Sequence, residues 1–127
     1  MKLRIKGNTL RLRLAQAELR SLAERGAVED RTEFPGGAAL VYRLRDDKKN
    51  DYITASYNGS LMEIRVPRAL VDRWHGTDLV TLSATLPLAA GELAIALEKD
   101  FACLAPREGE DESDNFPHPL APSGKSC

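Results

Sequence analysis

Hydrophobic and polar residues alternate along short stretches of the chain, and the same alternation appears twice. Residues 10–14 read LRLRL, and residues 62–66, which lie 52 positions later, read MEIRV. A repeat of two residues is typical of a β-strand that buries one face and exposes the other. We therefore predict a strand at each of these places, with its aliphatic side chains directed to the core.

A short helix is predicted after each of these strands. Leu19 and Leu22 are three residues apart in the first stretch, and Val71 and Trp74 are three apart in the second. This spacing places both apolar side chains on one face of a helix, which can then lie on a sheet. Gly26 follows the first helix at a position where a residue in the left-handed conformation often ends one.

Extending the comparison gives two units with the same order of elements, at about residues 2–47 and 51–100. Gly7-Asn8 and Asn58-Gly59 are hairpin signals at matching positions. Each unit alone would leave an unpaired strand edge, which pairing one half against the other removes. We predict an α+β fold, mostly β, in which two pseudo-repeated ββαββ units form an eight-stranded antiparallel barrel or a strongly curled sheet.

The composition changes near residue 106. Residues 108–115 read EGEDESDN, and Pro117, Pro119 and Pro122 follow. Such a sequence has too little apolar surface to offset the entropy of ordering the chain. We predict a single β-rich domain over residues 1–105 and an acidic, Pro-containing flexible tail over residues 106–127, in which Phe116 could dock on the domain.

Bulk properties favour a cytoplasmic protein. Hydrophobic residues make up 43% of the 127 residues, which is enough for a core. No apolar run approaches the ~20 residues that cross a bilayer, and the alternating N-terminus does not resemble a signal peptide. Charge is unevenly spread: residues 1–26 hold seven Lys/Arg against two Glu, whereas residues 98–127 hold three Lys/Arg against seven Asp/Glu.

The first hairpin carries a candidate binding face for an anion or an acidic partner. Its strands place five cations on one face: Lys2, Arg4, Lys6, Arg11 and Arg13. The alternative is an ordinary solvent face whose charges only keep leucine and isoleucine directed inward. Nucleic acid is an unlikely partner, because no aromatic residue interleaves with these cations to stack on bases.

A second candidate set alternates with apolar residues in the same way, and consists of Arg43, Arg45 and Arg65. In a wide polar barrel these side chains would line a tunnel for a phosphorylated ligand. The architecture resembles the CYTH superfamily, whose first strand carries Glu-x-Glu-x-Lys with metal-binding glutamates. Here the first strand reads Lys2-x-Arg4-x-Lys6, so neither a metal site nor metal-assisted hydrolysis is expected.

No other residues form a recognisable catalytic or metal site. Cys103, His118 and the acids near them match no structural zinc spacing, and a small buried cysteine explains Cys103 better. His75 is expected to interact with the C-terminus of the second helix. We therefore predict no catalytic residue, no metal and no cofactor.

Both ends of the chain resemble one family. The chain opens with KLRIKGNTLRLRL and later reads EKDFACL, an acidic stretch and FPHP. These runs are similar to those of small bacterial proteins catalogued as a domain of unknown function, with Thr9 in place of the usual serine and His118 in place of asparagine. The resemblance implies no activity.

Two functional hypotheses follow. The first is a non-enzymatic cytoplasmic binding or interaction module, whose basic hairpin face meets an acidic protein; the chain's own acidic tail is one such partner. The second is a small anion- or nucleotide-binding barrel for a phosphorylated small molecule, with or without hydrolysis. It requires several of the eight cations to converge on one cavity.

Overall fold

The computed structural model describes residues 1–101 and 113–117. These residues form two successive sets of elements with the order ββαββ. The first set is β1 (Lys2–Lys6), β2 (Thr9–Leu14), α1 (Gln16–Arg25), β3 (Ala27–Glu33) and β4 (Ala39–Asp47). The second set is β5 (Thr54–Tyr57), β6 (Leu61–Pro67), α2 (Arg68–Gly76), β7 (Thr81–Leu88) and β8 (Gly91–Lys99).

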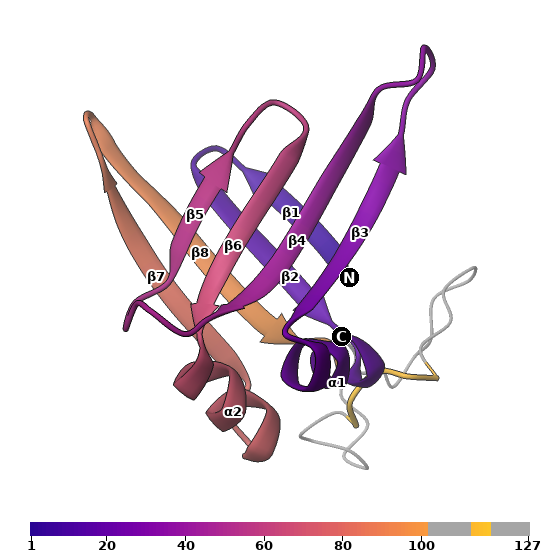
Figure 1. Ribbon diagram of the computed structural model, residues 1–127, viewed down its shortest axis with the longest axis vertical. Coiled ribbons are helices and arrows are strands. Elements are labelled where there is room, and N and C mark those ends of the chain that lie inside the picture. Colours follow the sequence, from indigo (N-terminus) through magenta and orange to yellow (C-terminus); the bar gives the residue numbers. More distant parts are fainter. Residues whose placement is uncertain (102–112, 118–127) are drawn as a thin grey trace.

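The strands form two four-stranded sheets, with the orders β1-β2-β8-β7 and β3-β4-β6-β5 (Figure 1). The prediction of a mostly β, α+β fold is confirmed. The hairpins are antiparallel, but the central pairs β2–β8 and β4–β6 are parallel, so the prediction of a wholly antiparallel arrangement is wrong. Each hairpin pairs with a hairpin of the other half, and that long-range choice sets the direction of the central pair.

The two sheets do not close into a barrel. β1, β3, β5 and β7 remain edge strands in the described part of the chain. Both helices lie at the same end of the sheets (Figure 1). Met1 packs against the core; its ammonium group contacts Glu18 and Asp30, and its carbonyl accepts a hydrogen bond from the Tyr42 hydroxyl at 3.1 Å.

Residues at matching positions of the two halves have matching partners. Leu12 of β2 lies opposite Leu3 and Leu97. Ile64 of β6, 52 positions later, lies opposite Ala55 and Leu44. β2 thus pairs with its two neighbours in the same register as β6 pairs with its two neighbours in the other sheet.

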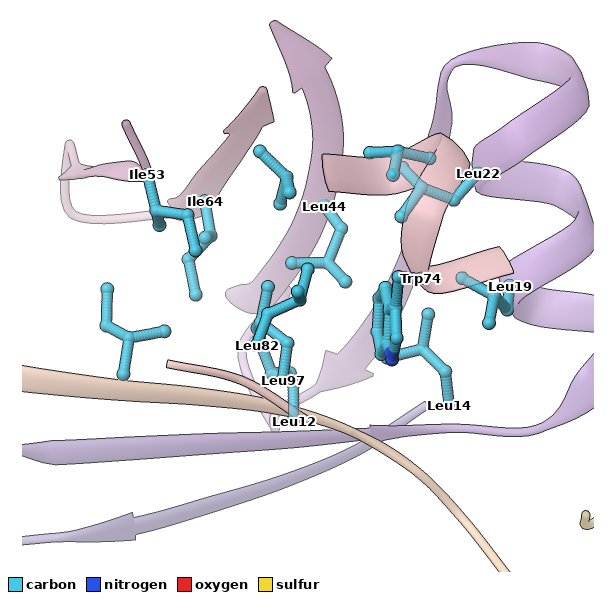
Figure 2. Close-up of a cluster of buried hydrophobic side chains, with 13 residues drawn as sticks. Leu12, Leu14, Leu19, Leu22, Leu44, Ile53, Ile64, Trp74, Leu82 and Leu97 are labelled. Atoms are coloured by element: carbon cyan, nitrogen blue, oxygen red, sulfur yellow. The ribbon is translucent and has the colours of Figure 1, made fainter. Parts of the chain in front are cut away.

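The space between the sheets is filled by aliphatic side chains and Trp74 (Figure 2). Leu12, Leu14, Ile64 and Leu97 are all at most 1% exposed. Trp74 of α2 inserts between the sheets, and its indole N–H donates to the Val80 carbonyl at 3.0 Å. Burying each such side chain contributes about 1.5–3 kcal/mol. This interior leaves no tunnel for the predicted cations.

The segment 113–117 lies against the start of α1. Ala15 carries no side-chain acceptor, and Asp114 takes that role: its carboxylate accepts from the Ala17 N–H at 3.0 Å, and its carbonyl accepts from the Gln16 N–H at 3.0 Å. The Phe116 ring packs edge-on against Phe101, with centroids 5.9 Å apart. These contacts attach part of the predicted tail to the domain; residues 102–112 and 118–127 lie outside the described residues.

Candidate functional site

The outer face of the sheet β1-β2-β8-β7 carries the five cations predicted for the first hairpin. We call Lys2, Arg4, Lys6, Arg11 and Arg13 the basic face. Alternate residues of β2 and β8, among them Leu12 and Leu97, are buried in the core. Because side chains alternate along a strand, Arg11 and its neighbours must point away from that core.

A trough of about 360 Å³ runs over this face. Arg4, Lys6 and Arg11 line one side, and Ser83 and Thr85 of β7 line the other. Between them the β8 side chains on this face are the small ones of Ala94 and Ala96, and the buried Ile95 of the same strand also lines the trough. The trough exists because short side chains on β8 lie between long cationic ones and the β7 hydroxyls.

The cations of the basic face differ in how far they are neutralised. Arg11 and Arg13 lie 2.7 Å and 3.6 Å from the carboxylate of Glu98, and Lys2 lies 3.1 Å from that of Asp100. Arg4 and Lys6 are exposed, and neither is in an ion pair within the described residues. The least neutralised charges therefore lie beside the trough.

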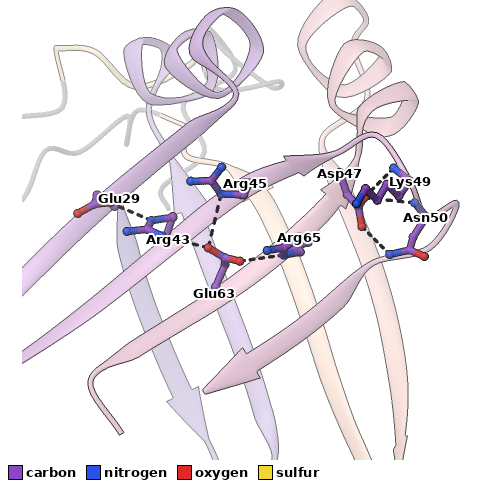
Figure 3. Close-up of polar contacts among 8 residues, drawn as sticks. All are labelled: Glu29, Arg43, Arg45, Asp47, Lys49, Asn50, Glu63 and Arg65. Atoms are coloured by element: carbon purple, nitrogen blue, oxygen red, sulfur yellow. Dashed lines mark hydrogen bonds and ion pairs between the residues drawn. The ribbon is translucent and has the colours of Figure 1, made fainter. Parts of the chain in front are cut away.

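The outer face of the other sheet carries Arg43, Arg45 and Arg65, arranged around Glu63 (Figure 3). The Arg65 and Arg43 guanidinium groups donate to the two Glu63 oxygens at 2.8 Å and 3.1 Å. Arg45 lies 3.6 Å from the same carboxylate. We call these four residues the Glu63 cluster; Glu29 extends it through a 2.9 Å hydrogen bond from Arg43.

Electrostatics in the Glu63 cluster favour the charged forms. Burial opposes ionisation of Glu63, but hydrogen bonds from Arg65 and Arg43 outweigh it and lower the pKa of the carboxyl group. Hydrogen bonds to Glu29 and Glu63 raise the pKa of Arg43. Glu63 is only 7% exposed, whereas the guanidinium groups of Arg45 and Arg65 reach solvent. This arrangement is a structural charge cluster.

Asp47, at the end of β4, has a second structural role (Figure 3). Its carboxylate accepts from the backbone N–H groups of Lys49 and Asn50 at 2.8 Å and 3.2 Å, and from the Asn50 amide at 2.9 Å. These hydrogen bonds, led by that from Lys49, lower the pKa of Asp47. The contacts fix the turn that joins the two halves.

The structure therefore divides the predicted residues into two groups on different sheets. Five form the basic face, of which Arg4, Lys6 and Arg11 converge on the trough, and three surround Glu63. Sequence reasoning assigned no role to Glu63, and it missed the floor and far wall of the trough. The alternation in residues 92–98, ELAIALE, carries the signal, since its small residues occupy one face.

Residues 1–120 match a family described as a family of unknown function, DUF7009. The chain belongs to this family. The resemblance seen at the two ends of the DUF7009 chain is thereby confirmed. No curated protein and no solved structure matches it, so the architectural similarity to CYTH proteins gains no support.

The described part of this DUF7009 member holds neither a membrane-spanning helix nor a gathered set of metal ligands. No helix in residues 1–101 or 113–117 has the length and apolar character needed to cross a membrane. In the same residues, no three His, Cys, Asp or Glu side chains gather as they would around a metal ion. Cys103 and His118 lie outside these residues.

Proposed function

We propose that this protein is a non-enzymatic cytoplasmic binding module whose basic face meets an acidic protein partner. One observation supports this above the others: Arg4 and Lys6 carry no ion pair within the described residues and lie beside an open trough. A cation without a local counter-charge raises the local potential, and it attracts an acidic surface.

The other arginine-rich face supports this choice by contrast. In the Glu63 cluster the guanidinium groups already donate to a carboxylate, so an incoming anion would have to compete with Glu63. The trough offers no such competitor beside Arg4 and Lys6. Its described lining consists of cationic, hydroxyl-bearing and apolar residues, with no carboxylate or imidazole to act as a general base.

Polyanion binding tests the proposal. The double variant Arg4→Gln/Lys6→Gln removes two positive charges from the basic face. The matched control, Arg20→Gln/Arg73→Gln, removes two exposed charges from the helices, so its net charge equals that of the first variant. On a heparin column at low salt, we expect the first variant to elute clearly earlier than the control. Equal elution of the two variants would show that only net charge matters, and would reject the proposed site.

A small phosphorylated molecule is a second candidate ligand for the same trough. It is favoured by the convergence of three cations on a volume of about 360 Å³. A ligand that binds only the folded protein raises the melting temperature by mass action. A rise in the melting temperature with tripolyphosphate or nucleotides that is lost in Arg4→Gln/Lys6→Gln would favour this candidate. An unchanged melting temperature with all these ligands would leave an acidic protein as the proposed partner.

The acidic tail is proposed as an internal competitor for the basic face. Deleting residues 108–127 would also remove Asp114 and Phe116, which contact the domain. A cleaner variant changes Glu108, Glu110, Asp111 and Glu112 to serine and keeps residues 113–117. We expect it to bind heparin more tightly than wild type. Retention that is unchanged at low salt would remove the tail from the proposal.

We also propose that the two ββαββ units are pseudo-repeats related by a half-turn. The matching partners of Leu12 and Ile64 support this relation. It implies that the basic face and the Glu63 cluster occupy corresponding outer surfaces. Paired core substitutions, described in the Discussion, test it.

A further inference from the structure

We infer that the occupant of the trough is an extended acidic polypeptide segment, lying along β8, with carboxylates at every second residue. This inference rests on the proposed function and narrows it to one kind of partner. It comes from the cross-strand rows of the sheet, the width of the trough and the chemistry of its two walls.

The trough consists of two cross-strand rows. Arg4, Arg11, Ala96 and Ser83 are opposite one another in the first row. Lys6, Thr9, Ala94 and Thr85 are opposite one another in the second row. Rows two residues apart along a strand are separated by about 7 Å, and alternate side chains of an extended segment have the same spacing. Of two successive carboxylates on one side of such a segment, the first can therefore meet Arg11 and Arg4, and the second can meet Lys6.

The width of the trough selects an extended chain. In the first row Arg11 on β2 and Ser83 on β7 are two strand spacings, or about 10 Å, apart, whereas Arg4 and Lys6 stand one strand further out, on β1. The β8 alanines form a low floor between β2 and β7. An α-helix with its side chains is about 10–12 Å across, so it would rest on the rims. A single extended chain fits between the walls.

The chemistry of the walls selects a polypeptide. One wall is cationic, and the other carries the hydroxyls of Ser83 and Thr85, which can donate to carbonyls and accept from backbone N–H groups. No aromatic side chain of the described residues lines the trough. Single-stranded nucleic acid would lack the stacking surface that such ligands use.

Glu98 defines the end of the site nearest the helices. It lies opposite Arg13 and contacts both Arg13 and Arg11. A third carboxylate placed over this row would meet Glu98. The segment is therefore expected to place its acidic residues over the first two rows only.

Two labelled peptides of equal composition test the inference. One alternates glutamate with threonine, and the other groups its glutamates in one block. In fluorescence polarisation at low salt, we expect the alternating peptide to bind about threefold more tightly, because two ion pairs form in register. Equal affinity would overturn the inference, as would tighter binding of single-stranded DNA of equal charge.

A substitution on the floor of the trough provides a second test of the inference. Ala96→Trp fills the trough without changing the net charge, and its side chain points to solvent, so the sheet should tolerate it. We expect it to weaken binding of the alternating peptide about tenfold. The matched control, Ala90→Trp, lies at the exposed turn between β7 and β8 and should have no effect.

The two tests separate the inference from the proposed function. If both peptides bind wild type, and Ala96→Trp changes neither affinity, the extended-segment inference fails while the basic face still binds anions. If neither peptide nor heparin binds wild type at low salt, the proposed function itself fails. A rise in the melting temperature with tripolyphosphate, without binding of either peptide, would also overturn the inference in favour of the small-molecule candidate.

Discussion

The two outer sheet faces have equivalent strand orders and both carry several arginines, yet they differ at the centre of the sheet. Glu63 on β6 lies opposite Arg43 of β4, and three arginines surround it. The position 52 residues earlier, on β2, is Arg11, which lies opposite Ala96. A carboxylate at the centre of one face produces a closed charge cluster; an arginine beside an alanine produces an open trough.

This difference shows that a count of cations does not locate a binding surface. Both faces carry several arginines, and the strand pairing decides which of them have a counter-charge. Partly exposed ion pairs such as Arg13–Glu98 contribute about 0–1 kcal/mol. Removing the Glu63 charge should cost more, because this buried carboxylate pairs with three arginines at once. The Glu63 cluster should therefore affect stability, and the basic face should affect binding.

The largest predicted effect tests whether the sheets are equivalent beneath these surfaces. Leu12 and Ile64 are 1% and 0% exposed, at matching register positions. Leu12→Ala and Ile64→Ala should each lower the free energy of unfolding by about 2–5 kcal/mol, because each leaves a cavity. Urea denaturation would measure both losses. Values that differ by more than about 2 kcal/mol would count against the half-turn relation between the units.

The second prediction compares the two faces directly. Glu63→Gln should lower the free energy of unfolding by about 2 kcal/mol, since it leaves Arg45 and Arg65 without an ion pair and Arg43 with Glu29 alone. Glu98→Gln makes the same chemical change on the basic face and should cost less than about 1 kcal/mol. Equal losses in urea denaturation would mean that the faces do not differ as described.

Acid should reduce the stability of the wild type more than that of Glu63→Gln. The pKa of Glu63 is lowered in the folded protein, so its contribution is complete above the unfolded pKa and is lost as the pH falls through the folded pKa. Denaturation curves from neutral pH down to below the usual glutamate range, about 4 to 4.5, should show the gap between the two proteins closing. A constant gap would show that Glu63 stabilises through packing and not through charge.

Local pattern predicted the elements and the direction of their side chains. Leu19, Leu22, Val71 and Trp74 are buried as their helical spacing indicates, and the five hairpin cations share one face. The parallel central pairs could not be predicted, because alternation within a strand does not identify its neighbour in space. For the same reason the trough was missed: its floor and far wall come from the last two strands of the other half.

The sequence allowed Phe116 to dock on the domain but did not predict the contacts of Asp114. The segment 113–117 is acidic and precedes several prolines, but Phe116 lies against Phe101 and the core, and Asp114 accepts from the first turn of α1. The signal was available in the helix itself, since Ala15 has no side-chain acceptor for the N–H groups that a helix leaves free at its start. Which acidic residue supplies the missing acceptor depends on the tertiary fold.

The smallest predicted effect concerns binding at the basic face. Glu98 neutralises part of the charge of Arg11 and Arg13, so Glu98→Gln should release donors next to the trough. We expect affinity for the alternating Glu/Thr peptide to rise about two- to threefold at low salt, with the gain lost near 0.5 M salt because of screening. Glu29→Gln is the matched control, since it removes an exposed carboxylate from the opposite face. If both substitutions raised affinity equally, the effect would come from net charge, and the ion pairs with Glu98 would have no part in limiting the site.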